Sequence, residues 1–184
     1  MASIGHIAVG LAFARHLRRD GGSLIPPMIA FSALSMLPDL DVIGCALGVP
    51  YGAPFGHRGA CHSLVFAVVC GLATIAVTYA RPVGSEDRAR RALRLGFYVL
   101  CVVASHGLLD AMTTGGKGVA LLWPFTPERF FFAWRPIPVA PIGTAFFSRR
   151  GLHVAAIELV EFAPFLAYAI FAGRKLSNGR ERIK

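Results

Sequence analysis

The chain has 184 residues, of which 55% are hydrophobic, and a mean hydropathy of +0.58. These values are high for a soluble protein of this length and favour a membrane protein with several apolar helices. The formal net charge of +9 would suit nucleic-acid binding, but the 19 Lys and Arg residues lie almost entirely between the apolar runs. Charges next to a membrane are expected there, so we do not expect nucleic acid to be the partner.

Five apolar runs predict an all-α, polytopic membrane helical bundle of four to five helices, formed as a single integral membrane domain over residues 1–184. The runs are Ser3–Leu17, a run ending at Leu37 with a further piece over Val42–Val49, Leu64–Ala80, Leu93–Ala104 with its continuation to Asp110, and Leu152–Ala172. The first run is short for a membrane span, which usually needs about 20 residues, whereas the third is long enough. Residues 117–150 are rich in proline and aromatic residues and predict an interfacial loop, since Trp favours the headgroup level.

The basic residues predict which side of the membrane each connection occupies. The segments 15–23, 81–94 and 174–184 hold 13 Lys and Arg residues, whereas 50–61 and 114–151 hold 6. Because basic loops tend to stay in the cytoplasm, the first three segments are expected there. At about 1.5 Å per helical residue, this topology brings the polar residues discussed next to one level near the extracytoplasmic side.

His106 and Asp110 are the first candidates for a metal site. They lie four residues apart at the end of the fourth run, so a helix places them on one face. An imidazole and a carboxylate in this arrangement suit a divalent metal, and ionisable groups at membrane depth usually have a function. The alternative is a polar pair that forms hydrogen bonds between helices.

A second polar pair, Asp39 and Asp41, follows Pro38, which interrupts the second run. A proline in a membrane helix frees backbone groups that need partners in protein or water, so two carboxylates beside it indicate a polar cavity. A helix sends residues two apart to different faces. We therefore expect one of them, in the first place Asp39, to bind the metal, and Asp41 to act as a base or to orient a ligand. A helix break with a capping carboxylate is the alternative.

Three more histidines join this set. His57 and His62 flank Arg58 before the third run, and His6 lies near the start of the first run. The topology brings these histidines to the level of His106, so we interpret them as further metal ligands, with solvent-facing or hydrogen-bonded histidines as the alternative. Arg58 is placed to bind an anion such as phosphate because guanidinium presents a fork of donors, although contact with lipid headgroups explains it equally well.

Glu158 and Glu161 lie three residues apart on the fifth run and share a helix face. By the same topology Glu158 reaches the level of the histidines. We interpret Glu158 as a general base or an additional residue of the metal shell. Pairing of these glutamates with Arg149 or Arg150 is the alternative.

These motifs together resemble one family. The ordered series is His6, Leu37–Asp41, Gly56–Ser63, Ser105–Asp110 and Leu121–Pro124, within residues 1–125. It is similar to the LexA-binding, inner-membrane-associated hydrolases, also described as membrane-bound metal-dependent hydrolases. That family often has threonine before the second histidine of its Gly-His-Arg motif, where this chain has Cys61. The resemblance implies a bacterial or archaeal inner membrane location and hydrolase activity.

A weaker resemblance is to zinc-dependent phospholipase C and the related zinc nucleases, which hold a zinc cluster with a similar order of ligands. In this chain the order would be His6, Asp39, His57 or His62, His106 and Asp110. The resemblance implies one or more Zn²⁺ ions and hydrolysis of a phosphoester in a lipid or lipid-linked substrate by metal-activated water. Two other functions stay open. One is a non-enzymatic membrane protein with a structural metal or an ion-handling site, and the other is an adaptor whose basic segment 81–94 binds a regulatory protein.

Overall fold

The computed structural model describes residues 3–17, 22–80, 88–141 and 143–172. Within these ranges the chain forms seven α-helices, and its β contacts are limited to two isolated bridges, Thr113 with Ile137 and Val119 with Phe130. The helices are α1 (Ser3–Ala14), α2 (Ile25–Met36), α3 (Val42–Ala46), α4 (Leu64–Ala80), α5 (Arg88–Ala111), α6 (Arg149–Glu161) and α7 (Ala163–Phe171). The predicted all-α class is confirmed.

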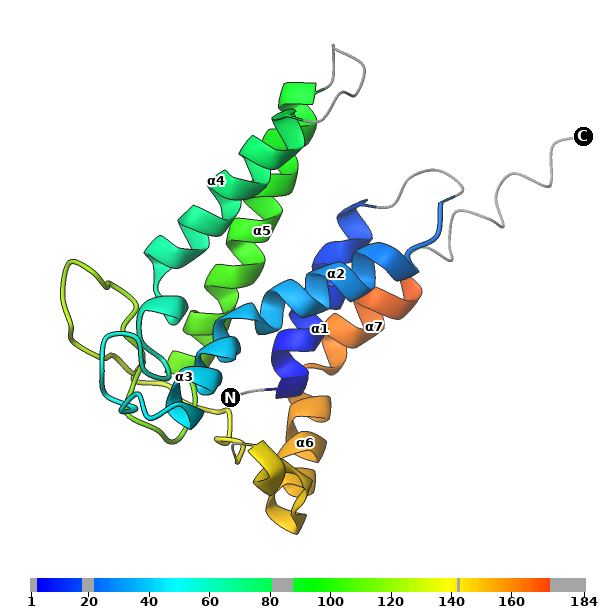
Figure 1. The fold of residues 1–184 in the computed structure, drawn as a ribbon. Helices are drawn as coiled ribbons and strands as arrows, with labels where there is room; N and C mark the ends of the chain where they lie inside the picture. Colours follow the sequence, from blue (N-terminus) through cyan, green and yellow to red (C-terminus); the bar gives the residue numbers. More distant parts are fainter. Residues whose placement is uncertain (1–2, 18–21, 81–87, 142, 173–184) are drawn as a thin grey trace, which may run out of the picture.

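The helices form two groups that meet along α5 (Figure 1). α4 packs along α5 as a hairpin, α1 packs on α2 and α7, and both α1 and α2 contact α5. The core at this junction consists of small and branched apolar side chains. Its buried residues are Ala14, Phe31, Ala67, Val99, Val102 and Val103. Close packing of these side chains joins the two groups.

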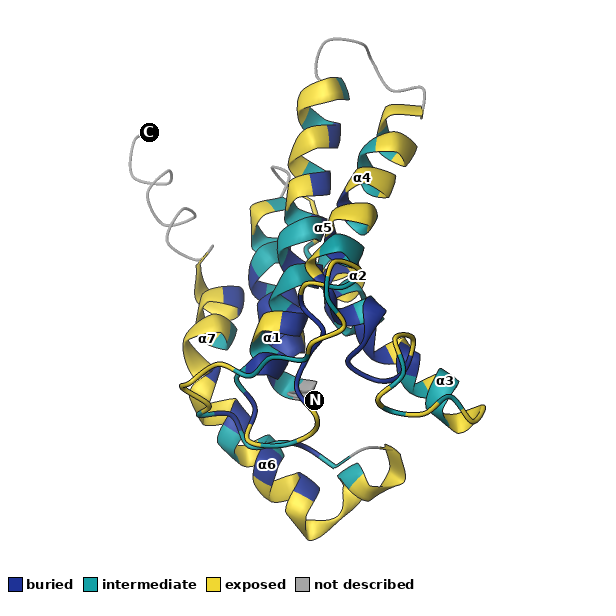
Figure 2. Cartoon of the chain, turned by 90° about the vertical axis from the view of Figure 1, so that its left-hand side faces the viewer, coloured by how far each residue is buried: buried dark blue, intermediate teal, exposed yellow. Residues whose placement is uncertain are grey.

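Figure 2 shows exposed residues along the outer faces of the helices. Many of these residues have large apolar side chains. Examples are Ile25, Ile29, Val69, Leu72, Val77, Leu93, Phe97, Phe165 and Ile170. Soluble monomers rarely expose extended apolar surface, so these faces fit contact with lipid. By length and composition, Ile25–Ala46 and Arg88–Ala111 are suited to cross a membrane, and α6 with α7 would add a third span if the bent pair forms one.

The third run forms α4 with the predicted bounds, but its 17 residues make it shorter than the two candidate spans of 22 and 24 residues. Two other predictions differ from the structure. α5 begins at Arg88, so the second part of the expected loop at 81–94 is helical, because Arg and Ala are good helix formers; residues 81–87 lie outside the described ranges. The fifth run is bent by 61° between α6 and α7, where Pro164 occupies the first turn of α7.

The break at Pro38 is milder than predicted. The chain continues from α2 through a 3-10 segment, Leu37–Asp41, directly into α3, because proline is tolerated in the first turn of the new segment. This segment meets the last turns of α5 and a 3-10 turn, Ala60–His62, that precedes α4. The predicted loop 50–61 and the first part of the predicted loop 117–150 lie at the end of the α4–α5 hairpin where α4 begins and α5 ends. The polar candidates therefore gather at one end of the bundle.

Candidate metal centre

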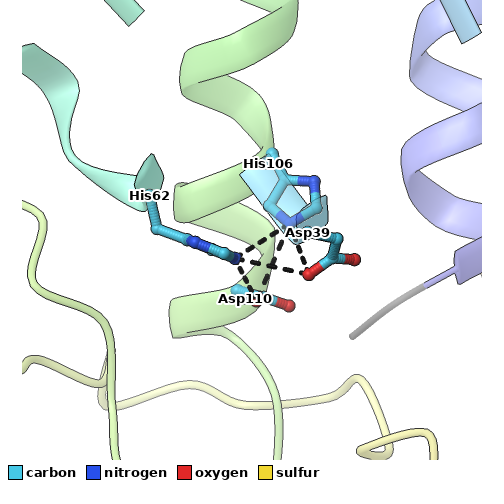
Figure 3. Close-up of side chains that lie close together, drawn as sticks. All are labelled: Asp39, His62, His106 and Asp110. Carbon is cyan, nitrogen blue, oxygen red and sulfur yellow. Dashed lines mark hydrogen bonds and ion pairs between the residues drawn. The ribbon is translucent and has the colours of Figure 1, made fainter. Parts of the chain in front are cut away.

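Four buried side chains from three segments point at one another in Figure 3. One ligand atom from each of Asp39, His62, His106 and Asp110 lies within 4.8 Å of the others, and we call these residues the donor group. His62 Nε2 is 3.1 Å from His106 Nε2, and Asp39 Oδ1 is 3.4 Å from each of these nitrogens. Asp110 Oδ2 is 3.4 Å from His62 Nε2 and 3.9 Å from His106 Nε2. Ligands of a tetrahedral zinc ion lie about 3.3 Å apart, so the separations suit one ion.

Contacts at the Nδ1 atoms of the two imidazoles direct their Nε2 atoms into the donor group. His106 Nδ1 lies 2.6 Å from the carbonyl oxygen of Ser35, to which it donates, and His62 Nδ1 lies 3.0 Å from Asp41 Oδ2. An imidazole that donates from Nδ1 presents a lone pair at Nε2. Two lone pairs 3.1 Å apart repel each other, so the arrangement requires a cation or a proton between them.

A proton on His62 is the competing occupant. Burial opposes a charge on this side chain, but the carboxylates of Asp110, Asp39 and Asp41, which lie 3.0 to 3.4 Å from its ring nitrogens, outweigh burial and raise the pKa of His62 to about 10. At neutral pH a metal ion must therefore displace this proton to bind.

Asp41 contacts the Nδ1 atoms of both His57 and His62. Its Oδ1 accepts a hydrogen bond from His57 Nδ1 at 2.7 Å, and its Oδ2 accepts the backbone N–H of Arg58 at 3.1 Å. Asp41, His57 and His62 form a second set that could hold a metal, but Asp41 and both Nδ1 atoms would have to give up these contacts. The two carboxylates thus lie in different surroundings: Asp39 belongs to the donor group, whereas Asp41 contacts His57 and His62 on the side away from that group.

Arg58 is buried and grips Asp110, so its headgroup alternative is wrong. Its Nε is 3.0 Å from Asp110 Oδ2, and its Nη2 donates to Oδ1 at 3.1 Å. Its Nη1 donates to Thr113 Oγ1 at 3.0 Å and to the carbonyl oxygen of Gly115 at 2.9 Å. A Cβ at Gly116, where φ is +95°, would lie 2.7 Å from Nη1, so glycine is required beside the guanidinium. The anion held by this guanidinium is a carboxylate of the protein.

His6 extends the cluster from α1. Its ring stacks on His106 with centroids 3.7 Å apart, and its Nε2 lies 3.6 Å from Asp110 Oδ1. Neither ring nitrogen of His6 has a hydrogen-bond partner within the described part of the chain, although the side chain is fully buried. Buried polar groups without partners cost free energy, so His6 has the properties of a ligand to an ion beside the donor group.

Glu158 lies outside both potential metal sets. Its Oε2 accepts the backbone N–H of Ile4 at 2.7 Å and of Gly5 at 3.3 Å, and thereby caps the start of α1. This position supports neither the predicted catalytic role nor a pairing with Arg149 or Arg150. Glu161 is exposed.

Arg129 was not a candidate, yet it fixes the loop that carries His57. Its Nη1 donates to the carbonyl oxygen of His57 at 3.0 Å, and its Nη2 donates to those of Tyr51 at 3.1 Å and Ala53 at 3.2 Å. Its guanidinium also lies over the Tyr51 ring, 5.7 Å from the centroid. The sequence signal is weak: a single arginine in an aromatic loop.

A pocket of about 310 Å³ is lined by two residues, His57 and Arg58, that connect it to the donor group and to Asp41. Its lining residues are Tyr51, His57, Arg58, Gly116, Val139, Ala140, Pro141 and Arg150. Burial raises the pKa of Tyr51, so its hydroxyl is a neutral hydrogen-bond donor at physiological pH. Arg58 connects the pocket to Asp110, and His57 connects it to Asp41.

Fold and site define a helical membrane protein with a buried His/Asp cluster suited to a metal ion. The chain belongs to the YdjM inner membrane protein family, which it matches over residues 1–178. It is 42% identical over 157 residues to Inner membrane protein YbcI of Escherichia coli (strain K12), an alignment covering 84% of this chain and 86% of that protein. No solved structure matches the chain. These names support the predicted inner membrane location and specify no reaction, so hydrolase activity stays a prediction.

Proposed function

We propose that the chain is a metal-dependent hydrolase of the inner membrane that cleaves a phosphoester of a lipid or lipid-linked substrate. The observation that carries this proposal is a pocket whose lining residues His57 and Arg58 connect it to the donor group and to Asp41. Arg58 lines the pocket and holds Asp110, while His57 lines it and is held by Asp41. A purely structural metal needs no adjoining pocket, whereas a hydrolase must admit its substrate next to the ion.

The donor set fits a divalent metal, and Zn²⁺ is the expected ion. Imidazole nitrogens and carboxylate oxygens are common zinc ligands, and the His106–Ser35 contact is the usual support for such a ligand. His6 adds a buried imidazole without hydrogen-bond partners among the described residues. When bound, such a metal lowers the pKa of a coordinated water to about 7 and polarises a phosphoryl oxygen.

His57 and Arg58 are the protein groups placed to assist the reaction. Asp41 fixes the ring of His57 through Nδ1, and within the described residues His57 Nε2 makes no hydrogen bond. His57 is therefore positioned to accept or donate a proton at Nε2 in the pocket. Arg58 holds Asp110 through Nε and Nη2, so it assists the reaction by positioning this carboxylate beside the ion.

The position of the site along α5 suggests the substrate. His106 is 18 residues beyond Arg88, which corresponds to about 27 Å along the helix and is close to the thickness of the hydrocarbon core. A pocket at this level lies near the phosphates of one leaflet. The distribution of basic residues favours the extracytoplasmic leaflet.

A structural metal is the second candidate, because four protein ligands also complete a closed tetrahedral site. In that case the ion stabilises the end of the bundle and catalyses nothing. A regulatory protein at the basic segment 81–94 is a separate expectation, and it predicts that substitutions in this segment impair function while the histidines tolerate change.

Metal removal distinguishes the first two functions. The purified chain would be analysed for metal, stripped with a chelator, and assayed with phosphatidic acid as a phosphomonoester and phosphatidylglycerol as a phosphodiester. A hydrolase loses turnover on stripping and regains it with Zn²⁺. A structural site gives a large fall in unfolding temperature on stripping and no turnover of either lipid in the metal-loaded protein.

A further inference from the structure

Arg150 lines the pocket from the first turn of α6 and has no assigned role in the proposed function. In the part of the chain that the structure describes, Arg150 makes no hydrogen bond and no ion pair. A cation in the first turn of a helix is unfavourable, because the free N–H groups there carry partial positive charge. An anion in the pocket would offset this repulsion.

The charges around the pocket also favour an anion. No acidic side chain lines it, and the positive charge of Arg58 is matched by Asp110, so Arg150 adds a charge that the lining does not balance. Lys117 Nζ lies 5.7 Å from the centroid of the Tyr51 ring and adds a second cation near the lining. The neutral hydroxyl of Tyr51 is a further donor.

The size and the apolar wall of the pocket restrict the anion. A volume of about 310 Å³ is at the lower end of the range of ligand pockets, roughly 300–1,000 Å³. Val139, Ala140 and Pro141 make part of the pocket lining apolar. The pocket therefore has room for a phosphate and a few carbon atoms.

We propose that Arg150 binds the phosphate of the substrate and that the pocket accepts phosphate esters with small headgroups. This inference rests on the proposed function for its substrate, but phosphate binding is measurable without turnover. The shared chemistry is a phosphate group, either free or at the head of a lipid.

The test measures binding of inorganic phosphate and of dihexanoyl phosphatidic acid to the full chain in detergent, with chelator present so that no metal contributes. Arg150→Gln should weaken binding about tenfold, as expected for loss of a charged hydrogen bond. Arg149→Gln is the matched control, because this neighbouring arginine has the same charge and does not line the pocket. It should change binding less than about twofold.

Tighter binding of the lipid than of inorganic phosphate would identify a headgroup pocket, and equal binding would identify a free-phosphate site; both support Arg150 as the anion ligand. Absence of binding by the unchanged protein, or equal weakening by the two substitutions, would overturn the proposal. Failure of the proposed function gives a different result, in which phosphate binds through Arg150 and the metal-loaded protein hydrolyses neither lipid.

Discussion

The candidate metal ligands and the residues that support them are close in space but differ in whether their polar atoms have hydrogen-bond partners in the protein. Asp41 and Arg58 form hydrogen bonds with other groups of the protein. Asp39 has no hydrogen-bond partner at either carboxylate oxygen among the described residues, and neither has His6 at its ring nitrogens. Buried polar groups in folded proteins are nearly always paired. The difference indicates that Asp41 and Arg58 stabilise the fold around the site, whereas Asp39 and His6 keep polar atoms available for an external cation.

Substitution of His106 should have the largest effect on metal binding and turnover. His106→Ala deletes a ligand nitrogen and the ring against which His6 stacks, so bound metal should fall below stoichiometric detection and turnover should fall at least about 100-fold. Metal analysis and lipid assays measure both effects. His153→Ala, at an exposed histidine of α6, is the control and should change neither. Full metal content in His106→Ala would remove the donor group from consideration.

A change in the supporting layer should weaken the site without abolishing it. Asp41→Asn replaces the carboxylate that holds the Nδ1 atoms of His57 and His62, so metal affinity should fall about 10–100-fold. Competition with a metal-binding dye measures the affinity. Glu161→Gln removes an exposed carboxylate and should leave it unchanged. An unchanged affinity in Asp41→Asn would mean that the two layers do not differ as inferred.

The proton on His62 makes metal binding dependent on pH. The pKa of His62 is raised from 6.5 to about 10, so the metal-free protein holds this proton at neutral pH and a metal must expel it. Affinity should therefore rise about tenfold per pH unit from about pH 6 to 8, with release of about one proton per ion. In the metal-free protein the same proton stabilises the fold fully below about pH 6.5, and this contribution is lost as the pH rises through about 10. Metal titrations at several pH values check the slope, and a flat profile would exclude His62 as a ligand.

The sequence predicts the convergence of the donor group because this follows from simple topology. Apolar runs mark the helices, and alternating directions bring the end of α2, the start of α4 and the end of α5 to one level. The spacing of His106 and Asp110 already implies a shared face. The outcome for Asp39 and Asp41 also follows from local geometry, because residues two apart on a helical turn diverge.

Long-range pairing accounts for what the sequence does not predict. Arg58 has a general affinity for anions, but only the fold shows that Asp110, 52 residues away, is the anion it holds. Arg129 donates to His57 across 72 residues of sequence, and no local pattern predicts this contact. The bend at Phe162 is a similar case, because the apolar run continues through it. Such contacts depend on how distant segments pack, and a local pattern carries no information about that.

Substitution of Glu158 should have the smallest effect on stability and activity. It tests whether a buried polar residue outside the donor group only supports the fold or also affects metal binding. Glu158→Gln keeps an acceptor oxygen for the N–H groups of Ile4 and Gly5 but removes a negative charge from the start of α1. The free energy of unfolding should fall by about 1 kcal/mol or less, with metal content and turnover retained. Thermal unfolding and the lipid assay measure the two quantities. Since His6 follows the capped turn directly, a selective loss of metal affinity would show that this cap positions His6. Loss of turnover with metal and stability intact would instead restore Glu158 as the general base.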